Sequence, residues 1–167
     1  MEPRYCIYKP YTKSLAPLVI ALAKEGGFDF AQWQIKALEI LAAVDTGLQF
    51  IQRIFGLSVP RQNGKTTIVE WYIITLAMMF GYRILWTAHN YNTTVKTLED
   101  FRNILGTKPN DEVRGIKYFN DALLRVSSKT AQESFTFKPQ AEGKGEGFIA
   151  FSCRTKTANL GNTFDII

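Results

Sequence analysis

An eight-residue stretch between two apolar segments constrains this chain more than any other feature of its sequence. It reads Val59-Pro60-Arg61-Gln62-Asn63-Gly64-Lys65-Thr66, and a strongly apolar run, 67–80, follows it. That run is apolar on every side of a helix, which predicts a helix over 64–80 that is buried all round. The run 53–58 predicts a parallel strand before the stretch. A strand, a short loop closing on Gly-Lys-Thr and a helix are the setting of a phosphate-binding loop.

The chemistry of such a loop follows from the start of its helix. The first N–H groups of a helix have no intrahelical partner and lie at its positive end, so they bind phosphate. Gly64 would let the backbone approach closely, Lys65 would place its charge on the outer phosphates, and the Thr66 hydroxyl would bind the accompanying Mg2+. The predicted nucleotide-binding residues of the loop are Pro60, Arg61, Gln62, Asn63, Gly64, Lys65, Thr66 and Thr67.

The stretch departs from the usual signature at its first position. Val59 stands where the signature has glycine, and Pro60 fixes the next φ angle. The alternative is a Lys-Thr helix start that binds no ligand.

Size and composition set the outer limits. The chain has 167 residues, 46% of them hydrophobic and 21% charged, as is typical of a soluble globular domain. We expect an arm over 1–27 and one domain over 28–167. The sequence has no apolar run of membrane-spanning length and no signal pattern, so we expect the cytoplasm and no membrane. Cys6 and Cys153 lack metal-ligand spacing and are expected to be reduced thiols.

The net charge of +5 permits a polyanionic partner without demanding one. Lysine and arginine are spread along the chain rather than clustered among aromatic residues. Charge alone therefore does not indicate a nucleic-acid-binding protein.

The remaining patterns predict an α/β chain. Helices are expected over 17–24, from a capping pattern at Asp29–Gln32 to about Asp45, and from Thr93 or Thr94 to Leu105. The continuous apolar run 83–88 predicts a central parallel strand. This order predicts a three-layer domain with a mainly parallel central sheet and right-handed crossovers.

The pattern changes after residue 110. Strands are predicted over 116–119 and 122–126, joined by a tight turn at Asn120-Asp121. Further short strands are expected over 135–137 and 148–152, and another begins at 163–167. These segments predict a β-hairpin region added to the central sheet.

Four blocks of the sequence resemble the ATPase domain of the large terminase subunit of tailed bacteriophages. The loop block is similar to the deviant Walker A motif of that family, which replaces the first glycine and keeps an Arg-Gln pair. The other blocks are Gln32-Trp33-Gln34, Trp86-Thr87-Ala88-His89-Asn90 and Leu160-Gly161-Asn162-Thr163-Phe164-Asp165-Ile166-Ile167. They resemble the adenine-side motif, the segment after Walker A and the approach to the Walker B strand.

The resemblance implies a P-loop NTPase fold of the RecA/ASCE type that uses ATP and Mg2+ to pump double-stranded DNA into a capsid. It also implies a homo-oligomeric ring, the portal and the small terminase subunit as partners, and the host cytoplasm as the location. By the family pattern the Walker B acids would follow Ile167, and Asp165, at the start of its strand, is a poor candidate. We therefore expect a truncated motor domain, without the family's nuclease domain, that binds nucleotide and hydrolyses little of it alone.

Several residues have two interpretations. Arg61 is expected to act with Lys65 in catalysis by reaching the γ-phosphate, or else to brace the loop. Gln34 would read adenine with its amide, or lie on a helix surface; Trp33 is expected in the core rather than as a stacking platform. Arg154 would supply the arginine that such motors take from a neighbouring subunit, or be a surface cation.

Three further residues stand beside these. Lys156 lies behind Arg154 in the sequence. His89 and Asn90 follow a strand at the edge where ligands bind, but a lone histidine is more often structural.

Two other functions stay open. One is a helicase-like nucleic-acid translocase that shares the glutamine motif and the loop. The other is a nucleotide-binding module that does not hydrolyse its ligand.

Overall fold

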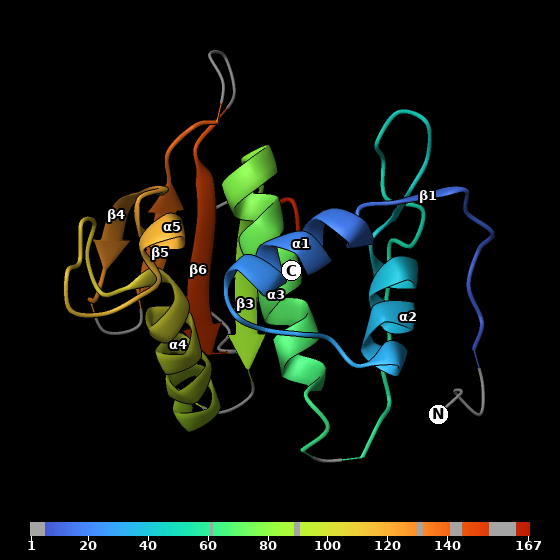
Figure 1. The fold of residues 1–167 in the computed structure, drawn as a ribbon, viewed down its shortest axis with the longest axis horizontal. Helices are drawn as coiled ribbons and strands as arrows, with labels where there is room; N and C mark the ends of the chain where they lie inside the picture. Colours follow the sequence, from blue (N-terminus) through green and yellow to red (C-terminus); the bar gives the residue numbers. More distant parts are fainter. Residues whose placement is uncertain (1–5, 61, 89–90, 130–131, 141–144, 154–162) are drawn as a thin grey trace. The chain divides into compact units, whose positions relative to one another are not determined.

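The computed structural model describes residues 6–60, 62–88, 91–129, 132–140, 145–153 and 163–167 (Figure 1). The backbone divides into two units, Met1–Thr75 and Leu76–Ile167, which are described separately. Helix α3 (Lys65–Phe80) begins in the first unit and ends in the second. In the part of the chain described, no helix is both long and apolar enough to cross a membrane.

The first unit is built on two helices and a small strand pair. Helices α1 (Ala16–Glu25) and α2 (Gln32–Leu41) contact each other, and each buries one apolar stripe. Strand β1 (Lys13–Ser14) pairs antiparallel with β2 (Ala43–Val44). The helix predicted over 17–24 is confirmed.

Helix α2 is shorter than the sequence predicts and begins later. It starts at Gln32 rather than after Asp29, and it ends at Leu41 rather than near Asp45. Residues 43 and 44 pair instead with β1, and the Leu15 N–H donates to the Ala42 carbonyl (2.9 Å). These pairings satisfy the backbone in place of a further helical turn.

Helix α3 matches its prediction. Every residue from Glu70 to Met78 is buried, so the helix is covered on all sides. Thr75 is accommodated inside because its hydroxyl donates to the Trp71 carbonyl, 2.8 Å away.

The strand predicted over 53–58 is wrong. These residues carry no regular secondary structure, and the Ile54 side chain is 92% exposed. A central parallel strand is buried on both faces, whereas every residue here is exposed or half-buried. The loop before α3 is therefore approached by irregular chain.

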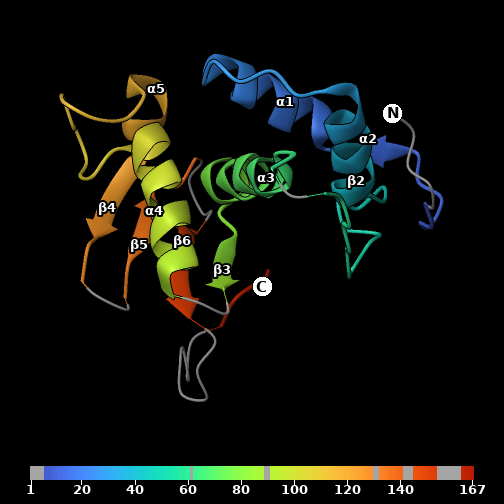
Figure 2. The same cartoon turned by 90° about the horizontal axis from the view of Figure 1, so that it is seen from below.

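The second unit contains a four-stranded sheet in the order β3-β6-β5-β4 (Figure 2). Its strands are β3 (Arg83–Ala88), β4 (Leu123–Ser127), β5 (Ser134–Phe137) and β6 (Gly147–Cys153). Strands β3 and β6 are parallel, and the other two pairs are antiparallel. An isolated parallel bridge joins Ile84 to Ile166 on the other side of β3. The described sheet is mixed rather than mainly parallel.

The predicted hairpin around Asn120-Asp121 is also wrong. Lys117–Asn120 forms the short helix α5, and β4 pairs with β5. Phe119 and Asn120 are buried while Tyr118 is half-exposed, which a helical turn accommodates better than a strand. The strands predicted over 122–126, 135–137 and 148–152 are confirmed.

Aromatic side chains form the core of the second unit, where α4 (Tyr91–Leu105) contacts β3 and β6. The Phe101 ring of α4 lies 6.1 Å from that of Phe135 and 5.0 Å from that of Phe151, measured between centroids. Phe135 and Phe151 are 5.9 Å apart. This triangle joins the helix to two neighbouring strands, with contacts that favour aromatic rings.

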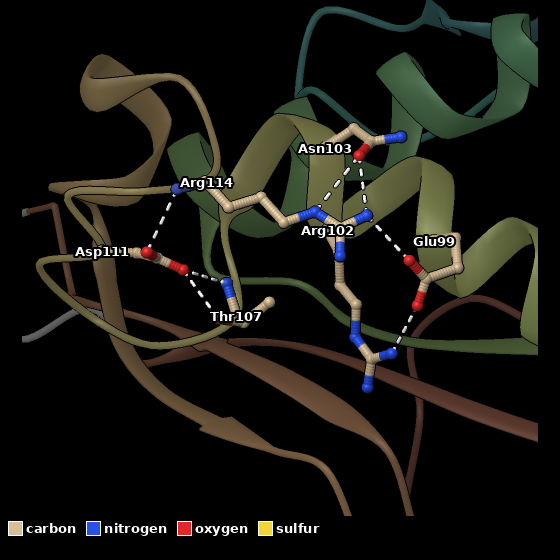
Figure 3. A network of polar contacts seen from close by, with 6 residues as sticks. All are labelled: Glu99, Arg102, Asn103, Thr107, Asp111 and Arg114. Atoms are coloured by element: carbon tan, nitrogen blue, oxygen red, sulfur yellow. Dashed lines mark hydrogen bonds and ion pairs between the residues drawn. The ribbon is translucent and has the colours of Figure 1, made fainter.

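A polar network fastens the loop after α4 (Figure 3). The Arg114 guanidinium donates to Glu99 (2.7 Å) and to Asn103 (2.7 Å), both on α4. Asp111 accepts the N–H and the hydroxyl of Thr107 (2.8 and 2.6 Å). Loop residues 107–114 are thereby tied to one another and to the helix.

Candidate phosphate-binding loop

The loop before α3 turns sharply. Gln62 has φ +63° and Gly64 has φ +69°, both in the left-handed region. Gly64 can adopt this angle freely, whereas for Gln62 it carries a strain of about 1 kcal/mol. Helix α3 begins directly afterwards, at Lys65.

Lys65 closes the loop on itself. Its ammonium group donates to the carbonyl oxygen of Val59, 3.1 Å away, although six residues separate the two. The Asn63 side chain also donates to the Pro60 carbonyl, over 3.4 Å. These bonds hold the first and last residues of the loop together and keep the Lys65 charge beside the start of α3.

Gln34 braces the end of the loop from α2. Its Nε2 donates to the carbonyl oxygen of Gly64 (3.1 Å), and its Oε1 accepts the N–H of Ala31 (2.8 Å). The side chain is buried, with 6% of the residue exposed. Gln34 is the third residue of α2, the position from which a glutamine side chain caps the N–H of the residue before the helix, here Ala31.

The described residues of the predicted loop are exposed or half-buried. Pro60, Gln62, Asn63 and Thr66 are exposed, while Lys65 and Thr67 are half-buried. The exposed Thr66 hydroxyl is a single oxygen donor, which fits Mg2+ because that ion takes one or two protein ligands and completes its shell with phosphate and water. The described residues contain no group of three or more His, Cys, Asp or Glu that could hold a metal.

Several predicted site residues lie outside the described residues. They are Arg61, His89, Asn90, Arg154 and Lys156. Trp33 is half-buried, so it is neither wholly in the core nor a free platform.

Asp165 lies at the amino end of β3. Its carboxylate accepts the N–H of Arg83 (2.8 Å), and its own N–H donates to the Arg83 carbonyl (2.8 Å). Ligands in parallel sheets bind at the opposite, carboxyl edge. This position agrees with the expectation that Asp165 is a poor candidate for a catalytic acid. Burial raises the pKa of nearby Tyr82, and the Asp165 charge raises it further.

The bond between Gln34 and Gly64 is not predicted from the sequence. The predicted capping pattern lies two residues early, at Asp29 and Gln32, and leaves the Gln34 amide free for a base. The signal was present in the sequence, because a glutamine two residues after Gln32 satisfies the same spacing from Ala31. The bond across 30 residues has no sequence signal.

Comparison with known proteins gives no relative: no family model, no curated protein and no solved structure matches this chain. The terminase-like blocks are therefore the basis of every assignment to that family, and those assignments stay predictions.

Proposed function

We propose that this chain binds ATP with Mg2+ at the loop from Val59 to Thr67. The observation that carries the proposal is the bond from the Lys65 ammonium to the Val59 carbonyl. It holds a cation at the start of a long buried helix, beside backbone N–H groups that have no intrahelical partner. Lys65 contacts the outer phosphates, and Thr66 binds the magnesium ion that the nucleotide brings.

We further propose that this binding belongs to a DNA-packaging motor of the terminase type. The support is the similarity of the loop, with its Arg61-Gln62 pair and Val59 in place of glycine, to the Walker A motif of that family. In this proposal Arg61 acts on the γ-phosphate, and Arg154 serves a neighbouring subunit in a ring. Double-stranded DNA is the substrate that the motor moves.

A nucleotide-binding role without rapid hydrolysis is the second candidate. It is favoured by the position of Asp165, whose carboxylate is engaged by the Arg83 N–H at the amino end of β3. An acid placed there is not at the edge where it would activate water.

Binding is tested with a fluorescent ATP analogue and the 167-residue chain. Lys65→Ala should lower the affinity ~100-fold or more. This loss corresponds to about 2.7 kcal/mol of binding free energy, as expected for a charge-assisted hydrogen bond to phosphate. Lys36→Ala is the matched control, because Lys36 is an exposed lysine on α2, and it should leave the affinity unchanged. Equal affinity of folded Lys65→Ala and wild type would reject the proposed site.

The motor role is tested by ATP turnover with and without double-stranded DNA. Turnover that double-stranded DNA stimulates supports the terminase proposal, and stimulation by single strands alone supports a helicase-like translocase. Tight binding without turnover under either condition supports the second candidate.

A further inference from the structure

We propose that Gln34 positions the phosphate-binding backbone of the loop and does not read the base of the nucleotide. This inference rests on the proposed nucleotide binding and assigns Gln34 a role different from adenine recognition. The two roles differ in a measurable way: a base reader changes the choice of nucleotide, whereas a positioning residue changes affinity for every ligand that carries the phosphates.

Both ends of the Gln34 amide are engaged inside the first unit. The oxygen accepts the Ala31 N–H and the nitrogen donates to the Gly64 carbonyl. The amide has a second N–H and a second lone pair, but only 6% of the residue is exposed. A base would have to displace one of the two existing bonds to pair with it, and this would leave a buried partner unsatisfied.

The bond to Gly64 acts on a single peptide group. In a trans peptide the C=O and the N–H point in opposite directions. Fixing the Gly64 carbonyl toward Gln34 therefore fixes the Lys65 N–H on the far side of the same plane. That N–H is among the first in α3, where the donors available to phosphate lie.

Close contact keeps this arrangement specific to glycine. A Cβ built on Gly64 would lie 2.8 Å from the Gln34 Nε2, and the φ of +69° is itself unfavourable for other residues. The Gln34 amide thus seats against the backbone of the loop and leaves no room for a side chain between them. A preorganised donor binds phosphate more tightly because it loses less conformational freedom on binding.

The test compares three ligands in the presence of Mg2+: ATP, GTP and inorganic tripolyphosphate. Gln34→Ala should weaken all three by the same factor, roughly tenfold, as expected for one lost buried hydrogen bond. The ratio of ATP to GTP affinity should stay at its wild-type value. Lys36→Ala, at an exposed residue of the same helix, should change none of the three affinities.

Gln34→Glu separates the loop from the stability of α2. The variant keeps an oxygen for the Ala31 N–H but replaces the donor to Gly64 with a carboxylate oxygen. It should weaken all three ligands at least as much as Gln34→Ala. In the ligand-free protein, the Lys65 amide resonance should shift in both Gln34 variants and stay unchanged in Lys36→Ala.

Each result decides the proposal. A selective loss of ATP, with GTP and tripolyphosphate unchanged, would make Gln34 a base reader and overturn the inference while leaving the proposed function intact. Unchanged affinities with an unchanged Lys65 resonance would also overturn it. If the wild-type chain binds none of the three ligands, the proposed function itself fails, and the inference fails with it.

Discussion

The indole of Trp71 in α3 lies against Gly26 at the end of α1, so closely that a Cβ on Gly26 would come 2.1 Å from the indole Cη2. Gly26 has φ −79°, which any residue adopts. Steric contact alone therefore requires glycine there, and the contact fixes how α1 and the first part of α3 pack within the first unit.

We predict that Gly26→Ala lowers the free energy of unfolding by about 2 kcal/mol, because the indole must leave its place. Gly56→Ala is the control, since a Cβ on Gly56 meets nothing within 4 Å; it should change stability by less than about 0.5 kcal/mol. Urea denaturation measures both. A smaller loss in Gly26→Ala/Trp71→Leu than the sum of the single changes would identify the indole as the cause, and additive losses would contradict it.

We predict that the side-chain amide of Asn120 contributes strongly to the stability of the second unit. It is buried, its Nδ2 donates to the carbonyls of Leu105 and Lys108 (2.7 and 2.8 Å), and its Oδ1 accepts the Asp111 N–H (2.9 Å). Asn120→Ala leaves these groups without their partner and should cost about 2–3 kcal/mol of stability.

Asn120→Asp is the sharper variant, because it keeps the acceptor and places a carboxylate oxygen against two carbonyls. Thermal and urea unfolding should show it to be at least as unstable as Asn120→Ala. An Asn120→Asp variant with wild-type stability would contradict the assigned bonds. The exposed Gln140→Ala serves as the control for loss of a surface amide.

Acid should weaken the loop after α4. Hydrogen bonds from the Thr107 hydroxyl and N–H lower the pKa of Asp111, and bonds from Arg114 and Arg102 lower the pKa of Glu99. Both carboxyls have ordinary values, 3.8 and 4.5, in the unfolded chain, so that chain binds more protons as pH falls. Their stabilisation is present above pH 4.5 and is lost as pH falls through the lowered values.

The measurement is the urea midpoint as a function of pH. Asp111→Asn should flatten its fall below pH 4.5, and Thr107→Val should make the fall smaller and end it at higher pH, because loss of the hydroxyl donor brings the folded-state pKa of Asp111 closer to its unfolded value. Thr93→Val, at an exposed threonine of α4, should follow the wild-type curve. An unchanged acid limb in Asp111→Asn would contradict the role of this carboxyl.

On the protein side, the effect of Mg2+ on ATP affinity should depend on the Thr66 hydroxyl. If its hydroxyl binds the ion, Thr66→Val should lower the affinity for ATP in Mg2+ by about tenfold and have little effect in EDTA, where the ion is absent. Thr66→Ser keeps the hydroxyl and should retain the effect of Mg2+. Calorimetry under both conditions distinguishes the two variants, and an equal loss for Ser and Val would remove Thr66 from the metal site.

Sequence patterns correctly predicted the helices and strands that are continuous apolar runs. Helix α3, the strand 83–88 and the strand 148–152 are continuous apolar runs of the right length, and each was found. The segments 53–58 and 116–119 also contain several apolar residues, but Ile54 is exposed and Phe119 enters the core from a helical turn. Short apolar runs do not determine their own conformation, because tertiary contacts decide it.

The loop could be proposed from the sequence because its residues are consecutive, and its phosphate-binding role stays a prediction. The contact of Gln34 with Gly64 could not be predicted, since it joins α2 to the loop through side-chain packing across 30 positions. The spacing of Gln34 from Ala31 could have revealed one of its two bonds, and that bond alone would have argued against a free amide.

The exposed Asn63 stands directly before Gly64 in the loop, and an Asn-Gly dipeptide is prone to deamidation. Because Gly64 has no side chain to shield it, its backbone nitrogen can attack the Asn63 side-chain carbonyl, which releases ammonia and forms a succinimide ring. Water then opens this ring to aspartate or isoaspartate. A negative charge appears where phosphate would bind, so stored protein should lose nucleotide affinity as its deamidated mass accumulates. Asn63→Ser should age without that loss.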